Sequence, residues 1–261
     1  SATAKTMIDA AQAAGRILMV AQVLRFFPAY RALAGAVRSG KMGAVRAAMF
    51  RRRCAAPRWS PWLMEESRSG GAALDLLIHD ADMCLHLFGA PQAVAATGYQ
   101  DLAKGIDWYS AHLDYGDVSA AVAGGWHPGE AFPFSMEYSV AGERGVMEYR
   151  MADGAPVLYR ATGGPEEMPL AETDGYQAEI EYFVECCRRK RQPPTKRSRG
   201  EFVCRRLLFP RLRLSIPCDR RAFREKGGGW RRLAAQPAAA VPFRFRAASL
   251  RNIVLDSSLP S

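Results

Sequence analysis

Six short runs of strand-forming residues follow one another from residue 92 to about residue 162, and this series constrains the fold most. The runs are separated by turn signals, and HLDYGDV and AGERGVM have the pattern of tight hairpin connections. Several consecutive strands of this kind predict an open sheet that is antiparallel or mixed. The six runs are AVAATGY, WYSAHLDY, VSAAVAGGW, FSMEYSV, GVMEYR and PVLYRA.

The segments on either side of this series predict the elements that complete the fold. Residues 3–14 favour a short helix, and the continuous apolar run at 17–24 favours a strand that is buried on both faces. A helix that leads into such a strand ends a βαβ unit, so we expect the neighbours of this strand to lie outside the chain. Helices are predicted at about 29–39 and 174–190, and a strand at 44–53. The predicted class is α/β (α+β), an open, mixed, mostly antiparallel sheet with helices on one face.

Residues 69–89, SGGAALDLLIHDADMCLHLFG, combine a nearly continuous apolar run with a regular series of ionisable side chains. On a helix, Asp75, His79, Asp82 and His86 fall on one narrow stripe, because their spacings follow the helical repeat. Leucine, isoleucine and phenylalanine cover most of the remaining circumference. A helix of this composition predicts a buried element with a polar stripe.

The residue types on this stripe are suited to acid–base chemistry. A carboxylate one turn from an imidazole raises the imidazole pKa toward neutrality and fixes its tautomer, as a general acid or base requires. Gly70 and Gly71 would let a ligand approach the backbone N–H groups at the start of the helix. Three other interpretations remain open on spacing alone: a solvated face, a buried histidine satisfied by aspartate, and a weakly supported metal site.

The net charge of +10 belongs to the last quarter of the chain. Residues 1–194 carry 20 basic and 22 acidic side chains, whereas residues 195–261 carry 16 and 4. The arginine-rich end, interleaved with Phe223 and Trp230, is compatible with nucleic-acid binding. We favour a solvated, disordered or foreign terminus over that interpretation, because no helical or strand period runs through it.

Nothing in the sequence indicates a membrane or an oxidising compartment. No apolar run approaches the ~20 residues that span a bilayer, and no signal-peptide pattern opens the chain. The six cysteines form no CxxC or Cys/His ligand pattern. We therefore expect a soluble, cytoplasmic protein with reduced thiols and no membrane partner.

Four segments, taken in order, resemble the Gfo/Idh/MocA family, the relatives of glucose-fructose oxidoreductase and inositol dehydrogenase. SGGAALDLLIHD resembles the signature G-G-x-x-x-D-x-x-x-H of that family. AAGRILMVAQVLRFFPAY resembles its last nucleotide-domain strand and R-F-x-P linker, and VRSGKMGAV resembles the turn before the first strand of its second domain. DGYQAEIEYFVECCRRKRQPP resembles its closing helix. Together the motifs cover about residues 3–194.

This resemblance implies an oxidoreductase that uses NAD or NADP to transfer hydride to or from a hydroxyl-bearing carbon of a sugar or cyclitol. It implies that His79 is the acid–base residue, and that Asp75 holds the substrate hydroxyl or steadies His79. It further implies a homo-oligomer that assembles through the open sheet. Further candidate contacts are Trp59, Trp62 and Asp80 for the substrate and Arg25 and Gln22 for the cofactor, with core packing as the alternative role of the two tryptophans.

The sequence departs from the family pattern at both ends. The glycine-rich loop G-x-G-x-x-G and the E-K-P lysine motif are not found in it. We therefore expect residues 1–27 to be a remnant of a Rossmann nucleotide-binding domain, 28–194 the substrate and oligomerisation domain, and 195–261 a basic tail. A chain organised in this way is expected to be inactive alone, and a non-catalytic dimerisation or binding module is the alternative function.

Overall fold

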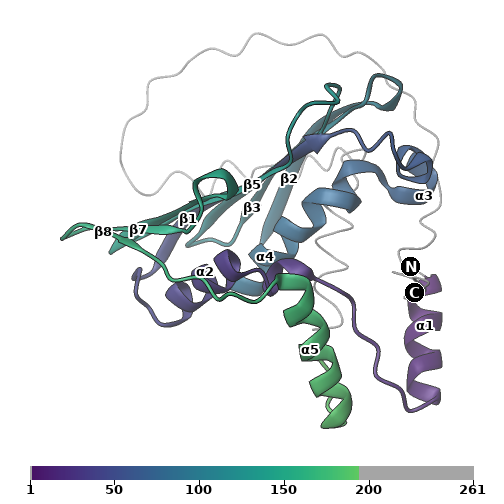
Figure 1. Ribbon diagram of the computed structural model, residues 1–261, viewed down its shortest axis with the longest axis horizontal. Coiled ribbons are helices and arrows are strands. Elements are labelled where there is room, and N and C mark those ends of the chain that lie inside the picture. The colour runs from purple at the N-terminus through teal and green to yellow at the C-terminus, as the bar shows by residue number, and fades with distance from the viewer. Residues whose placement is uncertain (1, 194–261) are drawn as a thin grey trace, which may run out of the picture.

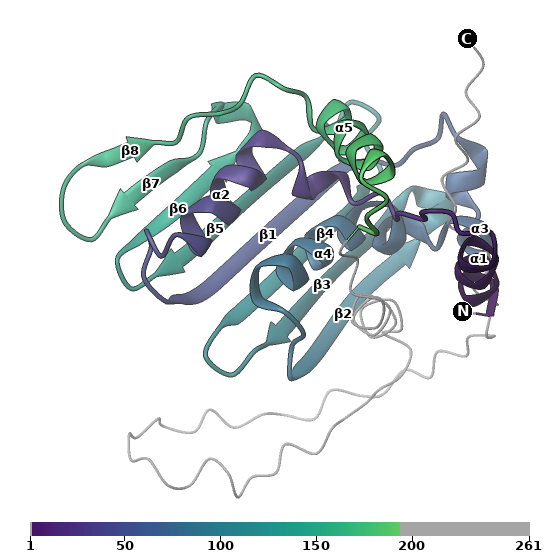
Figure 2. The same cartoon turned by 90° about the horizontal axis from the view of Figure 1, so that it is seen from below.

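The computed structural model describes residues 2–193, in which a single eight-stranded sheet is covered by helices on one face (Figures 1 and 2). The strand order is β2-β3-β4-β1-β5-β6-β7-β8. β1 and β4 pair in parallel, and every other neighbouring pair is antiparallel. The strands are β1 (Val45–Ala55), β2 (Ala93–Asp101), β3 (Ile106–Asp114), β4 (Ser119–His127), β5 (Ser135–Gly142), β6 (Gly145–Arg150), β7 (Val157–Arg160) and β8 (Pro165–Glu167).

The helices α2 (Pro28–Arg38) and α4 (Ile78–Phe88) lie side by side against one face of the sheet (Figure 2). α5 (Gly175–Arg188) lies on the same side and projects away from the sheet, and the short α3 (Glu66–Ser69) precedes the long helical segment (Figure 1). α1 (Ala2–Ala13) stands apart from this body at the end of an extended segment (Figure 1). The other face of the sheet is left without a helix among the described residues.

Strand alternation explains where the core lies. On β1, Ala48, Phe50 and Arg52 are buried toward the helices, whereas Met49 between them is 47% exposed on the open face. The covered face packs against the apolar sides of α2 and α4, and this layer is the main hydrophobic core. The sheet therefore has one face buried in the core and one face exposed to solvent.

The predicted fold class is confirmed. Each of the six runs that were predicted as strands between 92 and 162 forms a strand, as does the run at 44–53, and the helices expected near 3–14, 29–39 and 174–190 are present. Turn signals and period-two patterns were sufficient to predict these strands. They are local signals, and every strand but β1 pairs with a neighbour in sequence.

The strand predicted at 17–24 is not formed, and that prediction is wrong for the described residues. Arg16–Gln22 runs without strand pairing, and residues Val23–Arg25 form a 3₁₀ turn. Val20 is 62% exposed rather than buried between two helical layers. An apolar run becomes a strand only where another backbone offers hydrogen-bonding partners, and the described residues offer none here.

Two further features were not predicted correctly. The three-residue strand β8 was missed, because PEE has neither the length nor the composition of a strand. The amphipathic pattern of residues 174–190 predicts an apolar side formed by Tyr176, Ile180, Phe183, Val184 and Cys187. On α5 this side is exposed at Tyr176, Ile180 and Val184, and the helix buries Gly175, Glu179 and Cys186 instead. Helical amphipathicity thus predicted the element but not the side that packs.

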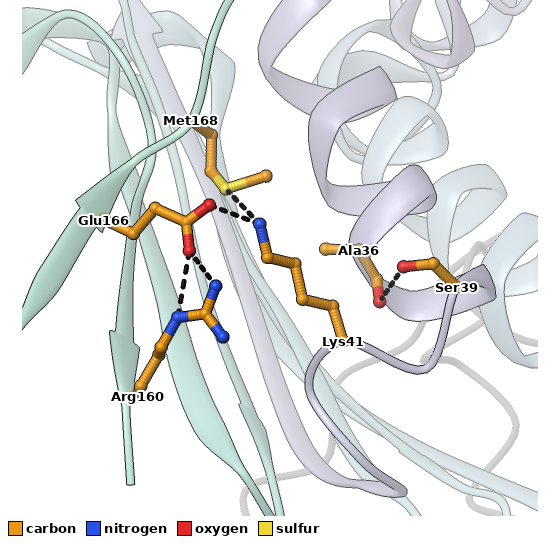
Figure 3. Close-up of polar contacts among 6 residues, drawn as sticks. All are labelled: Ala36, Ser39, Lys41, Arg160, Glu166 and Met168. Carbon is orange, nitrogen blue, oxygen red and sulfur yellow. Dashed lines mark hydrogen bonds and ion pairs between the residues drawn. The ribbon is translucent and has the colours of Figure 1, made fainter. Parts of the chain in front are cut away.

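An ion-pair network joins the turn after α2 to the far edge of the sheet (Figure 3). The ammonium of Lys41 contacts Glu166 on β8, and Nε of Arg160 on β7 donates to the same carboxylate at 2.9 Å. The sulfur of Met168 lies 4.0 Å from the Lys41 nitrogen. These contacts connect the last hairpin, β7–β8, to the turn after α2.

Within residues 2–193 no helix is long and apolar enough to cross a membrane. In the same part of the chain, no group of three or more His, Cys, Asp or Glu side chains is arranged to hold a metal ion. The predictions made for the basic segment 195–261 lie outside the described residues.

Candidate active site

The long apolar segment predicted as a helix is helical from residue 71 to residue 88, but it is not uniform. Residues Ala73–Leu77 form a π turn, η3, and α4 continues from Ile78. Single π turns within α-helices are rare and occur frequently at functional sites. Asp75 lies inside this turn and His79 immediately after it, so the local geometry changes where the predicted catalytic pair stands.

The start of this segment is anchored to the sheet by Asp107 of β3. Its Oδ2 accepts the backbone N–H of Ala72 at 2.6 Å, and the hydroxyl of Ser69 accepts the N–H of Gly71 at 2.9 Å. Gly71 has φ +67°, and a Cβ at this position would overlap the Asp107 carboxylate. The glycine is therefore required by a close approach of backbone and carboxylate.

The Asp75 carboxyl is partly buried and has one hydrogen-bond donor, the indole Nε1 of Trp126 at 3.3 Å. Burial raises the pKa of Asp75, and the hydrogen bond from Trp126 and the charge of Arg52 partly offset this rise. A carboxylate that accepts one protein hydrogen bond has acceptor capacity left for a hydroxyl group.

The His79 imidazole is held neutral by its surroundings. Burial and, to a smaller extent, the charge of Arg52 lower the pKa of His79, Asp80 partly offsets them, and the net result is a pKa of about 4. Its Nδ1 is buried and has no hydrogen-bond partner. A neutral ring with an unused nitrogen can accept or donate a proton to a bound molecule, and leaving such an atom unpaired costs stability unless a ligand uses it.

Asp80 was predicted to contact substrate, but the structure gives it another role. It is fully buried, and its two oxygens accept from Nε and Nη2 of Arg52 on β1 at 2.8 and 3.1 Å. Burial acts to lower the pKa of Arg52, but Asp80 reverses this effect and raises it. The pair is a structural ion pair, and because Asp80 has no exposed surface, a ligand cannot reach its oxygens.

The second half of the predicted stripe is occupied by protein contacts. Asp82 accepts from Nε and Nη2 of Arg25, both at 2.6 Å, and His86 contacts the Arg38 guanidinium of α2. Burial raises the pKa of Asp82, with Arg25 opposing this, and burial together with the two arginines lowers the pKa of His86 to about 4. The stripe is therefore divided between an unsatisfied first half and a satisfied second half.

The two predicted cofactor contacts, Arg25 and Gln22, also differ in whether their polar atoms already have a partner within the protein. Arg25 lies in the 3₁₀ turn that links the extended segment to α2, and its guanidinium is committed to Asp82. Gln22 precedes that turn, and its Oε1 is buried without a partner. Gln22 thus keeps an acceptor for a donor group, whereas Arg25 holds the 3₁₀ turn Val23–Arg25 against α4.

Trp59 and Trp62 lie in the segment between β1 and α3, and their side chains are 83% and 48% exposed. This exposure is contrary to the core-packing alternative. Exposed aromatic faces are suited to covering the C–H side of a sugar ring.

Three residues around this site were not singled out from the sequence: Arg52, Trp126 and Phe134. Arg52 is the inward-facing member of the triplet Arg51–Arg53, and strand alternation counted from Phe50 could have indicated that it is buried. Phe134 lies over the Arg52 guanidinium at 5.9 Å, and Trp126 is fully buried at the end of β4. No sequence signal connects Trp126 to Asp75, because the contact spans 51 residues.

Comparison with known proteins agrees with this geometry. Residues 30–148 match the family model described as GFO/IDH/MocA C-terminal domain. This part of the chain therefore resembles the C-terminal domain of the GFO/IDH/MocA family. The match begins within α2 and ends within β6, so it covers the helical segment that carries Asp75 and His79 and most of the sheet.

A curated relative of this domain is the scyllo-inositol 2-dehydrogenase (NADP(+)) IolW of Bacillus subtilis (strain 168). It is 38% identical over 66 residues, which are 24% of this chain and 18% of the relative. The local match supports this resemblance, and the chain spans less than a fifth of that relative's length.

Solved structures share the fold. UDP-N-acetylglucosamine 3-dehydrogenase GnnA from Acidithiobacillus ferrooxidans superposes with a TM-score of 0.60 at 23% identity, over 78% of this chain and 62% of that one. Aldose-aldose oxidoreductase from Caulobacter crescentus gives 0.63 at 21%, over 78% and 62%. Levoglucosan dehydrogenase, in complex with NADH and levoglucosan, gives 0.64 at 16%, over 77% and 64%. The chain thus spans less than two thirds of each of these proteins.

Proposed function

We propose that this GFO/IDH/MocA-like domain binds a sugar or cyclitol and supplies the acid–base residue of an NAD(P)-dependent oxidoreductase. The observation that carries the proposal is the first Asp-x-x-x-His pair. His79 keeps a buried, unpartnered nitrogen and Asp75 keeps acceptor capacity, although every other ionised group of the same helical segment is paired. Two unused polar groups one turn apart suit recognition of a polyol hydroxyl.

In the oxidation direction, the Asp75 carboxylate accepts the substrate O–H and orients it toward His79. The neutral imidazole then takes the hydroxyl proton, so that the C–O bond becomes a carbonyl as the hydrogen on the same carbon departs with its electron pair. In reduction His79 returns the proton. Trp59 and Trp62 cover the apolar side of the ring and exclude water.

NAD or NADP would supply the acceptor of that hydride. Of the residues predicted to contact it, Gln22 fits, because its buried Oε1 has no partner and can accept from an amide such as that of nicotinamide. The Arg25 guanidinium is already paired with Asp82, and we propose that it fixes the segment that carries Gln22.

A nuclear magnetic resonance titration of the chain with a panel of cyclitols and aldoses tests substrate binding. We expect shift changes at Asp75, His79, Trp59 and Trp62, and their loss in His79→Ala. The matched control is His86→Ala, which changes the second half of the stripe on the same helix. This variant should retain binding. Shift changes that are absent, or that persist in His79→Ala, would contradict the proposal.

Catalysis requires the cofactor, so its test joins this domain to a nucleotide-binding domain and follows NAD(P) reduction. Removing the acid–base group in His79→Ala is expected to slow turnover by about 10²–10⁴-fold, whereas His86→Ala should leave it near the parent rate. Equal rates for the two variants would remove His79 from the chemistry.

We also propose that the chain assembles through the open face of its sheet. That face carries the exposed apolar side chains Met49, Tyr99 and Tyr159, and no helix among the described residues covers it. Apolar side chains in one layer favour association with a similar layer. Light scattering after size exclusion should give a dimer or higher species that Met49→Lys weakens, and a monomer at high concentration would contradict this.

A further inference from the structure

Two residues that lie next to each other on adjacent strands hold Asp75 and the start of its helix. Asp107 on β3 and Trp126 on β4 are direct register partners in an antiparallel pair. Asp107 accepts the N–H of Ala72, and Trp126 donates its indole N–H to Asp75. A single cross-strand pair therefore contacts the helical segment at two points three residues apart, one just before the π turn and one within it.

Both members of this pair are fully buried, so their polar atoms have few alternatives. The Trp126 ring packs with Ala56, Leu63, Ala72 and Leu76 in a small core of its own, separate from the main core. This packing fixes the direction of the indole N–H, because a ring locked on all sides cannot rotate to another acceptor. Its hydrogen bond to Asp75 is thus built into the fold.

We propose that Trp126 is a positioning residue for the candidate site: its indole N–H fixes the orientation of the Asp75 carboxylate beside His79. The role concerns the site described under the proposed function, and it acts through Asp75 without contact with substrate. With one oxygen of Asp75 turned toward the indole, the other is directed to the hydroxyl that the site is proposed to bind. The π turn displaces the Asp75 backbone, and the hydrogen bond from the sheet fixes where its side chain ends.

If Trp126 served only in packing, the titration of the Asp75 carboxyl would not affect the Trp126 indole signal. This coupling can be measured in the full chain. In ¹H–¹⁵N spectra recorded from neutral pH to the acid limit of folding, we expect the Trp126 indole signal to shift as Asp75 titrates. Asp75→Asn should remove that titration from the indole signal. An indole signal that stays constant through the titration of the Asp75 carboxyl would overturn the proposal.

The second arm uses Trp126→Phe, which keeps most of the buried ring and removes the donor. The carboxyl ¹³C signal of Asp75 should then titrate at higher pH, because the charged form has lost its hydrogen bond. Trp108→Phe, on β3 with its ring beside His127, is the matched control and should leave the Asp75 midpoint unchanged. An unchanged midpoint in Trp126→Phe would overturn the assignment.

These readouts separate the two proposals. Coupling between Trp126 and Asp75 without any shift on addition of polyols would retain the positioning geometry and refute sugar binding. Polyol binding with no such coupling would do the reverse. Should Trp126→Phe fail to fold, the parent chain and Asp75→Asn decide the question, since neither alters residue 126.

Discussion

The two halves of the helical segment 71–88 carry the same Asp-x-x-x-His pattern, yet their side chains have different surroundings. Asp82 and His86 face α2 and the turn before it, and arginines there contact both. Asp75 and His79 face the end of the sheet, where Trp126 supplies one hydrogen bond and His79 Nδ1 has none. The difference teaches that unused hydrogen-bonding capacity, rather than residue type or spacing, distinguishes a candidate site from a structural contact.

The largest effect is expected at Asp80, which lies between the two halves. Asp80→Ala should lower the free energy of unfolding by about 3–5 kcal/mol, because Arg52 would remain buried without its carboxylate. Urea denaturation measures this. A double variant, Arg52→Met with Asp80→Leu, should recover much of the loss, whereas a small loss in Asp80→Ala would mean that Arg52 finds another acceptor.

The two histidines offer the next comparison, through the pH dependence of stability. The pKa of folded His79 is about 4 and that of an ordinary histidine about 6.5, so the unfolded chain binds the proton first as pH falls. The contribution of neutral His79 is complete above pH 6.5 and is lost as pH falls toward 4, at a cost of about 3 kcal/mol.

His79→Gln should therefore flatten the stability profile between about pH 6.5 and 4, as measured by urea denaturation at several pH values. His86→Gln should flatten it less, since solvent reaches a larger part of that ring and screens its interactions. Equal effects of the two variants would remove this distinction between the halves.

The two aspartates are expected to differ in the size of their effect on stability. Asp82→Asn should lower the free energy of unfolding by about 1.5 kcal/mol at neutral pH, because Arg25 loses a charged acceptor. Asp75→Asn should leave it nearly unchanged, since the amide oxygen of asparagine can still accept the Trp126 indole N–H and no arginine loses a hydrogen-bonded partner. A loss in Asp75→Asn as large as that in Asp82→Asn would show Asp75 to be a structural residue.

The smallest effect on stability is expected at Trp59, which we propose to contact the substrate together with Asp75 and His79. Trp59→Ala should change the free energy of unfolding by less than about 0.5 kcal/mol, since the ring is mostly in solvent. The same variant should weaken polyol binding in the magnetic resonance titration. Unchanged binding would remove Trp59 from the proposed site and leave the assignment of Asp75 and His79 intact.

Particular elements show how far the sequence alone predicts this fold. The strands between 92 and 162 were predicted because each pairs mainly with a neighbour in sequence, so local patterns carry most of the information. The prediction of a strand at residues 17–24 was wrong, because an apolar run has the same sequence whether or not a partner strand is present. α5 was predicted as a helix, but its packed side was not, because hydrophobicity alone does not state which neighbours are available.

For the site, the sequence alone is enough to place two carboxylates and two imidazoles on one helical stripe, and the family motif within that stripe marks Asp75 and His79 as the candidate pair. Only the tertiary structure decided which polar groups are left unused. Arg52, Trp126 and Arg25 come from distant segments and either pair with a group or leave it free. The physical reason is that helical spacing is a local property, whereas desolvation and hydrogen bonding depend on whatever the folded chain places against each side chain.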